Sequence, residues 1–334
     1  MVQPTIRFRR GNTPPSFLFS SHRWVLPLLL LVGVSPQRAA ERVIFHPGWF
    51  ASAQFAGIFT ALDRGFYRDA GLDVSIEPFA FGQNGPAAID AQPEICALGT
   101  IEGYILLQKR NDGADLKALA AMLQESPAGY MSLAASKVRS VRDFSGERVG
   151  VHKFGDTLYG WFTHKAGLAP GAAQMIFVGD DVTLLTRGKI DVMQGYATEE
   201  FIRLQDLTDN SSQFLSFTSL GFPSYSEILY TTAGQVDRHA ATLKTFIAAT
   251  RRGWIYALDH PRDAIASLAT RMDQTVDLEH LRKTLTALKP YVCPDNHEPL
   301  APMDPGKWRT VQQVGLEAGL IRQIEPTEHF LLNW

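Results

Sequence analysis

The sequence predicts an α/β fold of two lobes with a ligand cleft between them, closed by a helical C-terminal tail. The chain has 334 residues, 45% of them apolar and 20% charged, which is an ordinary globular composition. From Arg42 onward, short apolar or β-branched runs alternate with helical stretches. That alternation is typical of βα units that build largely parallel sheets. It occurs in two series, and helices dominate after residue 232.

The first series extends to about residue 136. Its strand candidates lie at 43–46, 72–79, 95–99, 116–123 and 130–136. Apolar residues at helical spacing predict a helix over 53–68, and Gly71 follows it as a stop signal. A glycine-rich turn at 82–86 precedes a short helix, and another helix is expected over 101–109.

The second series begins with a loop and a strand at 141–151 and ends near residue 223. Its strand, helix and strand are expected at 173–179, 181–190 and 191–196. A further strand candidate at 228–232 starts the tail. Helices of the tail are expected at 239–258, 261–272, 277–288 and 306–319. Ligands in such folds usually lie beyond the carboxyl ends of the strands, so we sought site residues there.

The first forty residues are expected to be a signal peptide. They contain five arginines and no acidic residue, and an apolar run spans Trp24 to Val34. Eleven apolar residues are about half of the roughly 20 that a membrane-spanning helix needs, so a permanent anchor is the weaker interpretation. Arg9 and Arg10 leave a twin-arginine signal open. The sequence therefore predicts export to the periplasm.

The remainder of the chain is acidic, with 27 basic and 34 acidic residues from Glu41 onward. This balance gives no reason to expect nucleic-acid binding. The two cysteines, Cys96 and Cys293, lie too far apart in sequence for a zinc knuckle or a redox CxxC motif. A single disulfide is possible in an oxidising compartment, but two separate buried thiols are favoured.

Four blocks, in this order, resemble type II periplasmic solute-binding proteins, in particular the branch that binds thiamine-pyrimidine precursors. They are GIFTALDRGFYRDAGLDV, VRDFSGERVGV, LLTRGKIDVMQGYATEE and WRTVQQVGLEAGLI. The resemblance covers about residues 42–321. It implies two Rossmann-like lobes joined by crossovers near 126–136 and 222–232. Lobe 1 would comprise 41–130 and 228–334, with lobe 2 at 131–227.

The resemblance also implies candidate ligand contacts in lobe 1. The family has an aromatic residue followed by an N-H-A-G element that faces the cleft. The matching stretch here is GWFASAQFAG, with Trp49 at the aromatic position, Gln54 for the asparagine and Phe55 for the histidine. Trp49 can stack on a ring or pack in the core. Phe55 removes a group that could titrate or bind a metal, which puts the family's chemistry in doubt here.

The residues themselves indicate further candidates in lobe 1. Gly82, Gln83 and Asn84 precede a helix, where backbone N–H groups can bind an acceptor, although a plain turn is an equal alternative. Thr100 follows a strand and can contact the ligand or cap the next helix. Glu102 can accept from an amine or face solvent.

In lobe 2, Phe154 and Asp156 follow a strand, and a helix cap by Asp156 or Thr157 is favoured over a ligand contact. Tyr196 ends a strand and can stack or donate a hydrogen bond. Glu199 or Glu200 can pair with the donors of an amino-heterocycle, against a pair of solvated acids at a helix start. By the resemblance, Glu200 matches the family glutamate. A hinge or rim candidate, Tyr225, lies where the chain returns to lobe 1.

The predicted function is that of the substrate-binding protein of an ABC importer, which captures a small heterocycle such as a thiamine-pyrimidine precursor. Binding of an alkanesulfonate, nitrate or riboflavin-like ligand is the alternative, although the named candidates are neutral or acidic. The family also includes fungal pyrimidine synthases. Those depend on a cysteine-rich iron motif, which two isolated cysteines cannot reproduce, and no HExxH, G-x-S-x-G or P-loop pattern occurs. We therefore expect a monomeric binding protein without catalysis, cofactor or metal, and an inner-membrane permease as its partner.

Overall fold

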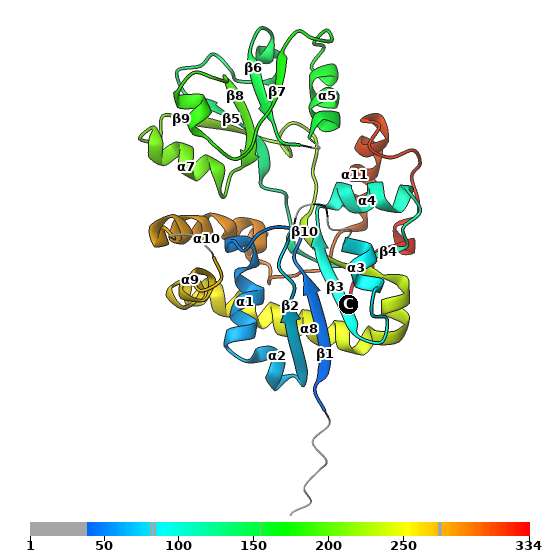
Figure 1. Cartoon of the computed structure of the whole chain (residues 1–334). Coiled ribbons are helices and arrows are strands. Elements are labelled where there is room, and N and C mark those ends of the chain that lie inside the picture. Colours follow the sequence, from blue (N-terminus) through cyan, green and yellow to red (C-terminus); the bar gives the residue numbers. More distant parts are fainter. Residues whose placement is uncertain (1–38, 81, 83–84, 154, 273–275) are drawn as a thin grey trace, which may run out of the picture. The chain divides into compact units, whose positions relative to one another are not determined.

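Two five-stranded sheets form the framework of residues 39–334, which make one compact unit (Figure 1). The computed structural model describes residues 39–80, 82, 85–153, 155–272 and 276–334. The expected signal peptide therefore lies almost entirely outside the described residues. Within these ranges, no helix is long and apolar enough to cross a membrane. The α/β class with helices towards the C-terminus is confirmed.

The first sheet has the strand order β2-β1-β3-β10-β4. Its strands are β1 (Glu41–His46), β2 (Leu72–Ile76), β3 (Cys96–Ile101), β4 (Leu116–Leu123) and β10 (Ser226–Thr232). Strands β2, β1 and β3 are parallel, whereas β10 runs antiparallel to both of its neighbours, β3 and β4. The carboxyl ends of β1 and β3 therefore meet the amino end of β10 at one edge of the sheet.

Both faces of this sheet are buried, which explains its nearly continuous apolar strands. Successive side chains of β1 alternate between two hydrophobic clusters, since Val43 and Phe45 belong to one and Ile44 to the other. The first cluster includes side chains of α1 (Ala56–Asp63), α8 (Ala233–Asp259), α9 (Pro261–Ala269) and α10 (Leu278–Val292). The second includes side chains of α3 (Gly85–Asp90), α4 (Gly103–Asn111) and α11 (Pro305–Glu317).

The second sheet has the order β7-β6-β8-β5-β9. Its strands are β5 (Ala128–Leu133), β6 (Arg148–Val151), β7 (Gln174–Phe177), β8 (Val192–Tyr196) and β9 (Ser212–Ser216). Its neighbouring helices are α5 (Asp156–Lys165), α6 (Thr183–Thr186) and α7 (Glu200–Leu207). Adjacent residues of β5 again alternate, with Tyr130 in the cluster that contains α5 side chains and Met131 in the cluster that contains those of α6 and α7.

The chain passes between the sheets twice, through residues 124–127 and 217–225. The backbone N–H of Ser126 donates to the carbonyl of Ser224 at 2.8 Å, so the two linking segments are joined to each other. Because β10 follows the second link and inserts between β3 and β4, the first sheet contains strands from both sides of the excursion.

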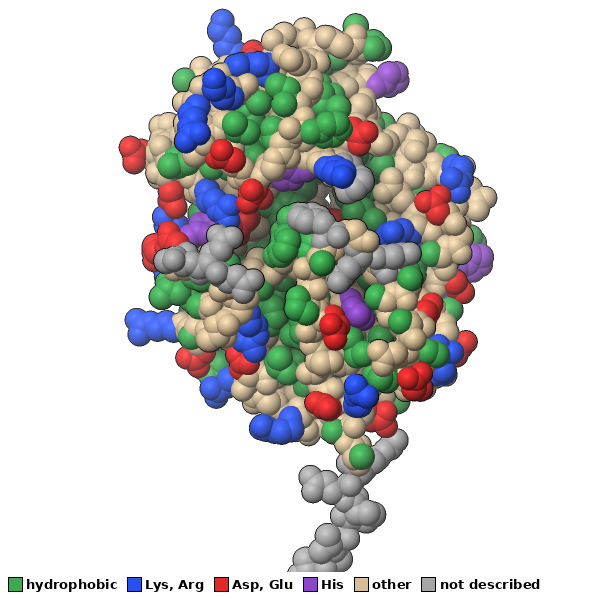
Figure 2. Space-filling model, in the orientation of Figure 1, with side chains coloured by type: hydrophobic (Ala, Val, Ile, Leu, Met, Phe, Trp, Pro, Cys, Tyr) green, Lys and Arg blue, Asp and Glu red, His purple; other side chains and the backbone are tan. Residues whose placement is uncertain are grey.

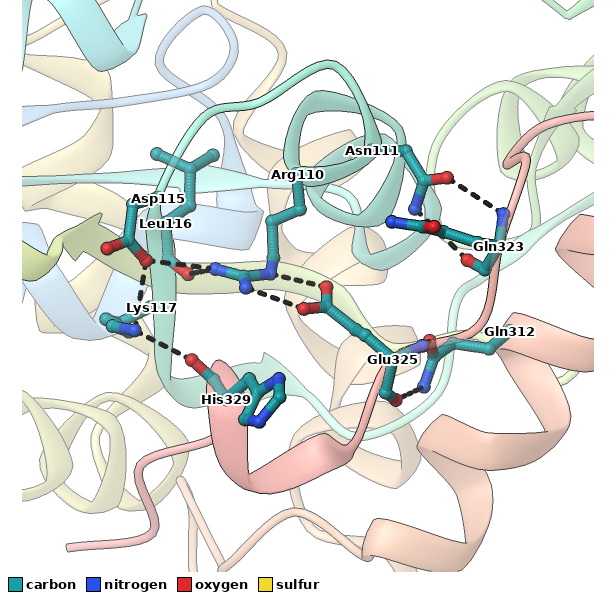
Figure 3. A network of polar contacts seen from close by, with 9 residues as sticks. All are labelled: Arg110, Asn111, Asp115, Leu116, Lys117, Gln312, Gln323, Glu325 and His329. Carbon is teal, nitrogen blue, oxygen red and sulfur yellow. Dashed lines mark hydrogen bonds and ion pairs between the residues drawn. The ribbon is translucent and has the colours of Figure 1, made fainter.

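Polar contacts fix the C-terminal segment against the first sheet (Figure 3). Glu325 accepts two hydrogen bonds from Arg110, at 2.6 Å from Nε and 2.7 Å from Nη2. The guanidinium also donates to the carbonyl of Leu116. Lys117 on β4 donates to the carbonyl of His329. The segment after α11 is thus tied to α4 and β4.

Local glycine geometry changes one expected helix. The segment 53–68 is divided into the 3-10 turn η1 (Ala53–Phe55), α1 and α2 (Phe66–Asp69). Gly65 between α1 and α2 has a φ of 72°, in the left-handed region that ends a regular helix.

Strand β9 has no counterpart among the expected strands. Cys96 and Cys293 are both free, as favoured, with Cys96 buried and Cys293 partly buried.

Candidate functional site

A cluster of polar side chains lies where the carboxyl ends of β3 and β8 meet the amino end of β10. Glu102 follows β3 and is the N-cap residue of α4, but its side chain does not cap that helix. Instead its Oε1 accepts from the Tyr196 hydroxyl at 2.7 Å and from the Ser226 hydroxyl at 2.5 Å. Tyr196 is the last residue of β8. The Glu102 carboxylate therefore connects the ends of the two sheets.

Glu102 is half-buried and held among hydrogen-bond donors. Burial raises the pKa of its carboxyl above the ordinary value, and hydrogen bonds from Ser226, Tyr196 and the Glu227 backbone oppose that rise. Burial and the neighbouring Glu102 charge raise the pKa of the Tyr196 phenol. The phenol therefore stays protonated and acts as a donor to Glu102.

Glu227 is the main site residue that the sequence interpretation missed. It lies in β10, is 5% exposed, and has a φ of 48°, which is rare for a residue with a side chain. Its Oε2 is buried and has no hydrogen-bond partner among the described residues. Burial and the Glu102 charge raise its pKa to about 8, against a hydrogen bond with Thr100 that lowers it. A lone acidic residue in an otherwise buried strand was the available sequence signal.

Thr100 supports this group from β3. Its hydroxyl accepts from the backbone N–H of Gly48 at 2.8 Å, so it ties the turn after β1 to β3 and does not cap the next helix. A Cβ at Gly48 would lie 2.6 Å from the Thr100 carbonyl oxygen, so only glycine permits this approach. The contact fixes the start of the segment that carries Trp49.

Trp49 belongs to an exposed aromatic cluster with Phe50 and Phe79. The ring centroids of Trp49 lie 5.5 Å from those of Phe50 and 5.4 Å from those of Phe79, and Phe50 and Phe79 are 5.0 Å apart. Trp49 and Phe50 are each 47% exposed, which excludes a core position for the tryptophan. Figure 2 shows a hollow in one face of the molecule, with hydrophobic, histidine and charged side chains of both signs around it.

Glu200 and Glu199 make different contacts at the start of α7. Oε2 of Glu200 accepts from the backbone N–H of Tyr196 at 2.8 Å, and burial raises the Glu200 pKa. Glu200 thereby holds the end of β8. Glu199 instead accepts from Arg203 at 2.5 Å and from His280 of α10 at 2.8 Å. Neither is a solvated helix-start acid, and Glu199 forms a second contact across the two sheets.

Two histidines lie beside this region with buried, unpartnered ring nitrogens. His46 ends β1 and His152 follows β6, and the Nε2 of each has no hydrogen-bond partner among the described residues. Burial lowers the pKa of His46, which keeps its imidazole neutral. The backbone N–H of His152 donates to Gln194 at 3.1 Å. Histidines thus occupy the carboxyl edges of both sheets.

The remaining predicted residues of lobe 1 are dispersed. Gln54 is half-buried in η1. Phe55 is fully buried between Phe45 and Phe59, at centroid distances of 6.4 and 6.3 Å, so it is a core residue. Gly82 is exposed with a φ of 86°. Gln83 and Asn84 lie outside the described residues.

Three predicted residues remain, Phe154, Asp156 and Tyr225, and neither of the two that the structure describes belongs to the polar cluster. Asp156 is exposed in the first turn of α5, and the N-cap residue is Gly155, so the expected cap by Asp156 or Thr157 is wrong. Phe154 lies outside the described residues. Tyr225 is buried and its hydroxyl accepts from the backbone N–H of Asp304 at 2.7 Å, so its side chain is not on a rim. The structure thus brings Thr100, Glu102 and Tyr196 together, and their ligand contacts stay predictions.

Comparisons with known proteins agree with this architecture. A family model described as NMT1/THI5 like matches residues 52–264. The chain is 24% identical over 244 residues, 70% of this chain and 75% of the other, to a 4-amino-5-hydroxymethyl-2-methylpyrimidine phosphate synthase of Legionella pneumophila. It is 22% identical over 245 residues, 72% and 73% of the two chains, to the formylaminopyrimidine-binding protein of Halalkalibacterium halodurans.

Among solved structures, the periplasmic aliphatic sulphonate binding protein SsuA of Escherichia coli is similar, with a TM-score of 0.62 and 16% identity. The match covers 87% of this chain and 91% of that protein. This likeness shows the fold of a periplasmic binding protein. At that identity it carries no information on the ligand.

Proposed function

Because this chain belongs to the NMT1/THI5-like family, we propose that it is an exported binding protein that captures a small nitrogen heterocycle for an ABC importer. The ligand is a pyrimidine of the thiamine-precursor type. The two α/β halves bind it between the carboxyl ends of their strands, and the closed form delivers it to a membrane permease. Ligand affinity for the closed form drives the shift between states.

One observation supports a pyrimidine ligand over an anionic one. Glu102, Ser226, Glu227 and Thr100 at the end of the first sheet adjoin Tyr196 of the second sheet, and the charged members of this group are acids. Carboxyl groups in a buried setting favour ligands rich in N–H donors and disfavour anions. The exposed Trp49 cluster adds aromatic surface for a flat ring. A sulfonate or nitrate ligand would lack a complementary charge here.

Ligand-induced stabilisation tests this function. The protein is purified without denaturation, and its thermal midpoint is measured with 4-amino-5-hydroxymethyl-2-methylpyrimidine, a formylaminopyrimidine, riboflavin and an alkanesulfonate. We expect the pyrimidines to raise the midpoint by several degrees at 100 times their Kd, since binding to the folded state alone adds about 2.7 kcal/mol. Stabilisation by the sulfonate alone would contradict the proposal. Native mass spectrometry of the untreated protein shows whether a heterocycle is retained unmodified.

Pyrimidine synthesis is the second candidate, because relatives from Legionella pneumophila and Candida albicans are named as pyrimidine phosphate synthases. We favour binding without turnover. The two cysteines are isolated from one another in sequence and do not reproduce the cysteine-rich iron motif of the fungal enzymes. Incubation with iron and a phosphorylated heterocyclic cofactor as precursor under air, followed by mass spectrometry, tests this choice. Formation of a pyrimidine phosphate would establish an enzyme instead.

Export is the part of the proposal that depends on the leader. The basic, apolar and polar order of residues 1–40 supports removal of that segment on secretion. Expression of the full chain in a Gram-negative host should yield a periplasmic protein that lacks about the first 40 residues. Intact-mass measurement of that fraction gives the mature N-terminus. A cytoplasmic protein of full mass would contradict export.

A further inference from the structure

We propose that Glu102 and Glu227 together form the specificity site for the amidine edge of an aminopyrimidine, that is, an exocyclic NH2 group next to a ring nitrogen. The inference rests on the proposed function and assigns the two carboxyl groups that recognise the ligand. Glu102 accepts from the exocyclic amine, and the protonated carboxyl of Glu227 donates to the ring nitrogen.

The contacts of Glu102 support its role as the acceptor. Two hydroxyl groups, from Tyr196 and Ser226, donate to the same oxygen, and the Glu227 backbone N–H also donates to this carboxyl group. Three donors directed at one carboxyl group favour its ionised form. A carboxylate accepts from an amine more strongly than a neutral oxygen does.

The geometry of Glu227 supports its role as the second contact. A buried carboxyl oxygen without a partner is rare in folded proteins, because leaving it unsatisfied costs free energy. The left-handed backbone at this non-glycine residue is a second cost at the same position. Such strain is concentrated at functional sites, where a ligand can satisfy the unpaired group. Thr100 holds one side of the carboxyl and leaves Oε2 for the ligand.

The pair shares one proton near neutral pH. The charge of Glu102 and burial raise the pKa of Glu227 to about 8, so this carboxyl is a donor in neutral solution. The other titratable groups that interact electrostatically with Glu102 or Glu227 are the phenols of Tyr104 and Tyr196, and burial raises the pKa of both. Neither phenol titrates between pH 5 and 9. One donor beside one acceptor is the complement of an amidine edge, which offers an acceptor beside a donor.

The Tyr196 hydroxyl donates to the acceptor oxygen of Glu102. This hydroxyl lies 2.7 Å from Glu102 Oε1, the position that a ligand N–H would take. Binding therefore exchanges one donor for another, and the Tyr196 ring is freed to pack against the heterocycle. This exchange explains how a carboxylate can stay satisfied in both states.

Calorimetric titration with two related probes tests the assignment without any variant. The probes are 4-amino-5-hydroxymethyl-2-methylpyrimidine and its 4-oxo counterpart, in which the donor and acceptor of the edge are reversed. We expect at least 30-fold tighter binding of the amino compound at pH 6.5. Its Kd should rise about tenfold per pH unit above pH 8, as the pair loses its proton. Equal binding of the two probes, or a Kd that is constant to pH 9.5, would overturn the inference.

Single substitutions show which residue causes the preference for the amino compound and which causes the pH dependence of its Kd. Glu102→Gln should bind the amino compound at least tenfold more weakly. Glu227→Gln, whose amide can donate in place of the acid, should keep its affinity at pH 6.5 and lose the dependence on pH above 8. Tyr196→Phe removes the competing hydroxyl and should bind three- to tenfold more tightly, so weaker binding would contradict its role. Glu77→Gln, an exposed acid just after β2, is the matched control and should behave as the wild type.

The outcomes separate this inference from the proposed function. If the wild type binds the amino compound and both Glu102→Gln and Glu227→Gln match it at every pH, the assignment is wrong and the heterocycle-binding function stands. If the wild type binds no pyrimidine, the function is wrong and the assignment falls with it. Circular dichroism at each pH confirms that the variants are folded.

Discussion

Glu227 couples the stability of the fold to pH. In the unfolded chain its carboxyl loses its proton near pH 4.5, whereas in the folded protein the pKa is raised to about 8. Between these values the folded state binds more protons than the unfolded state, so the free energy of unfolding falls as pH rises. With respect to Glu227, the protein therefore has its full stability below pH 4.5, and the loss of unfolding free energy caused by this residue is complete above pH 8.

Glu227→Gln removes this dependence. We expect the variant to gain about 4 kcal/mol over the wild type at pH 8 compared with pH 4.5, since the wild type loses about 1.4 kcal/mol for each pH unit between these values. Urea unfolding at pH 4.5, 6 and 8 measures the difference. Glu77→Gln, at an exposed position, is the control and should follow the wild type at each pH. A Glu227→Gln curve parallel to the wild type would contradict the buried neutral acid.

Single residues of the site were only partly predictable from sequence. Thr100, Glu102 and Tyr196 were found because each lies at or just after the end of a predicted strand, and the structure brings them to one place. Glu227 was missed because the predicted strand begins at residue 228 and excludes it, and its left-handed φ has no sequence marker outside glycine and asparagine. Phe55 was placed by motif alone, and its side chain fills the core.

At the scale of elements, α1 and α8 approach closely through glycines. A Cβ at Gly253 of α8 would lie 2.0 Å from the carbonyl oxygen of Gly57 in α1 and 2.7 Å from the Cβ of Ala61. Gly253→Ala should therefore destabilise the protein by about 3 kcal/mol, since neither helix can yield without disturbing the core. Gly160→Ala in α5 has open space around its new Cβ and should be neutral or stabilising by about 0.5 kcal/mol. Denaturant unfolding compares the two, and equal stabilities would contradict this packing.

The C-terminal segment depends on a paired arginine with a 10% exposed side chain. Glu325→Gln removes one charge from the two-bond contact with Arg110 (Figure 3). We expect a loss of about 1–3 kcal/mol in thermal or urea unfolding, because the guanidinium keeps its charge without a full partner. Asp112→Asn changes the exposed pair with Arg322, whose side chains are 71% and 68% exposed, and should cost less than about 0.5 kcal/mol. Equal losses of unfolding free energy in Glu325→Gln and Asp112→Asn would show that burial of an ion pair does not determine its contribution to stability.

Helices and strands were predictable where the hydrophobic periodicity and the flanking turn residues indicate the same boundaries. The strands at β1, β3, β4 and β8 coincide with short apolar runs flanked by turn residues. Strand β9 was missed because all five of its residues, SQFLS, are only partly buried and give no alternation. The break in the expected helix at 53–68 shows the opposite case, since apolar spacing continues through Gly65 and conceals the change in backbone direction.

At the scale of the whole molecule, α10 of the first half contacts the start of α7 in the second half. His280 Nε2 lies 2.8 Å from Glu199 Oε1, and Lys283 lies 2.5 Å from Asp206. If the closed arrangement binds the ligand, as proposed, these contacts support affinity at a distance from the ligand itself.

His280→Ala should therefore weaken binding of the amino compound by about three- to tenfold and increase the radius of gyration measured by small-angle scattering. Arg282→Ala on the same helix removes an exposed pair with Glu279 inside α10 and is the control. It should leave both measurements unchanged. An unchanged scattering profile and Kd for His280→Ala would show that this contact does not bias closure.

The position of β10 has a further consequence for how the chain can be assembled. Because the strand after the second link inserts between β3 and β4, a chain cut once near residue 219 would give two fragments that each lack part of the first sheet. Neither fragment can complete that sheet alone. Co-expressed as separate polypeptides, the two pieces should recognise each other through the edges of β3 and β4 and reconstitute a nicked protein.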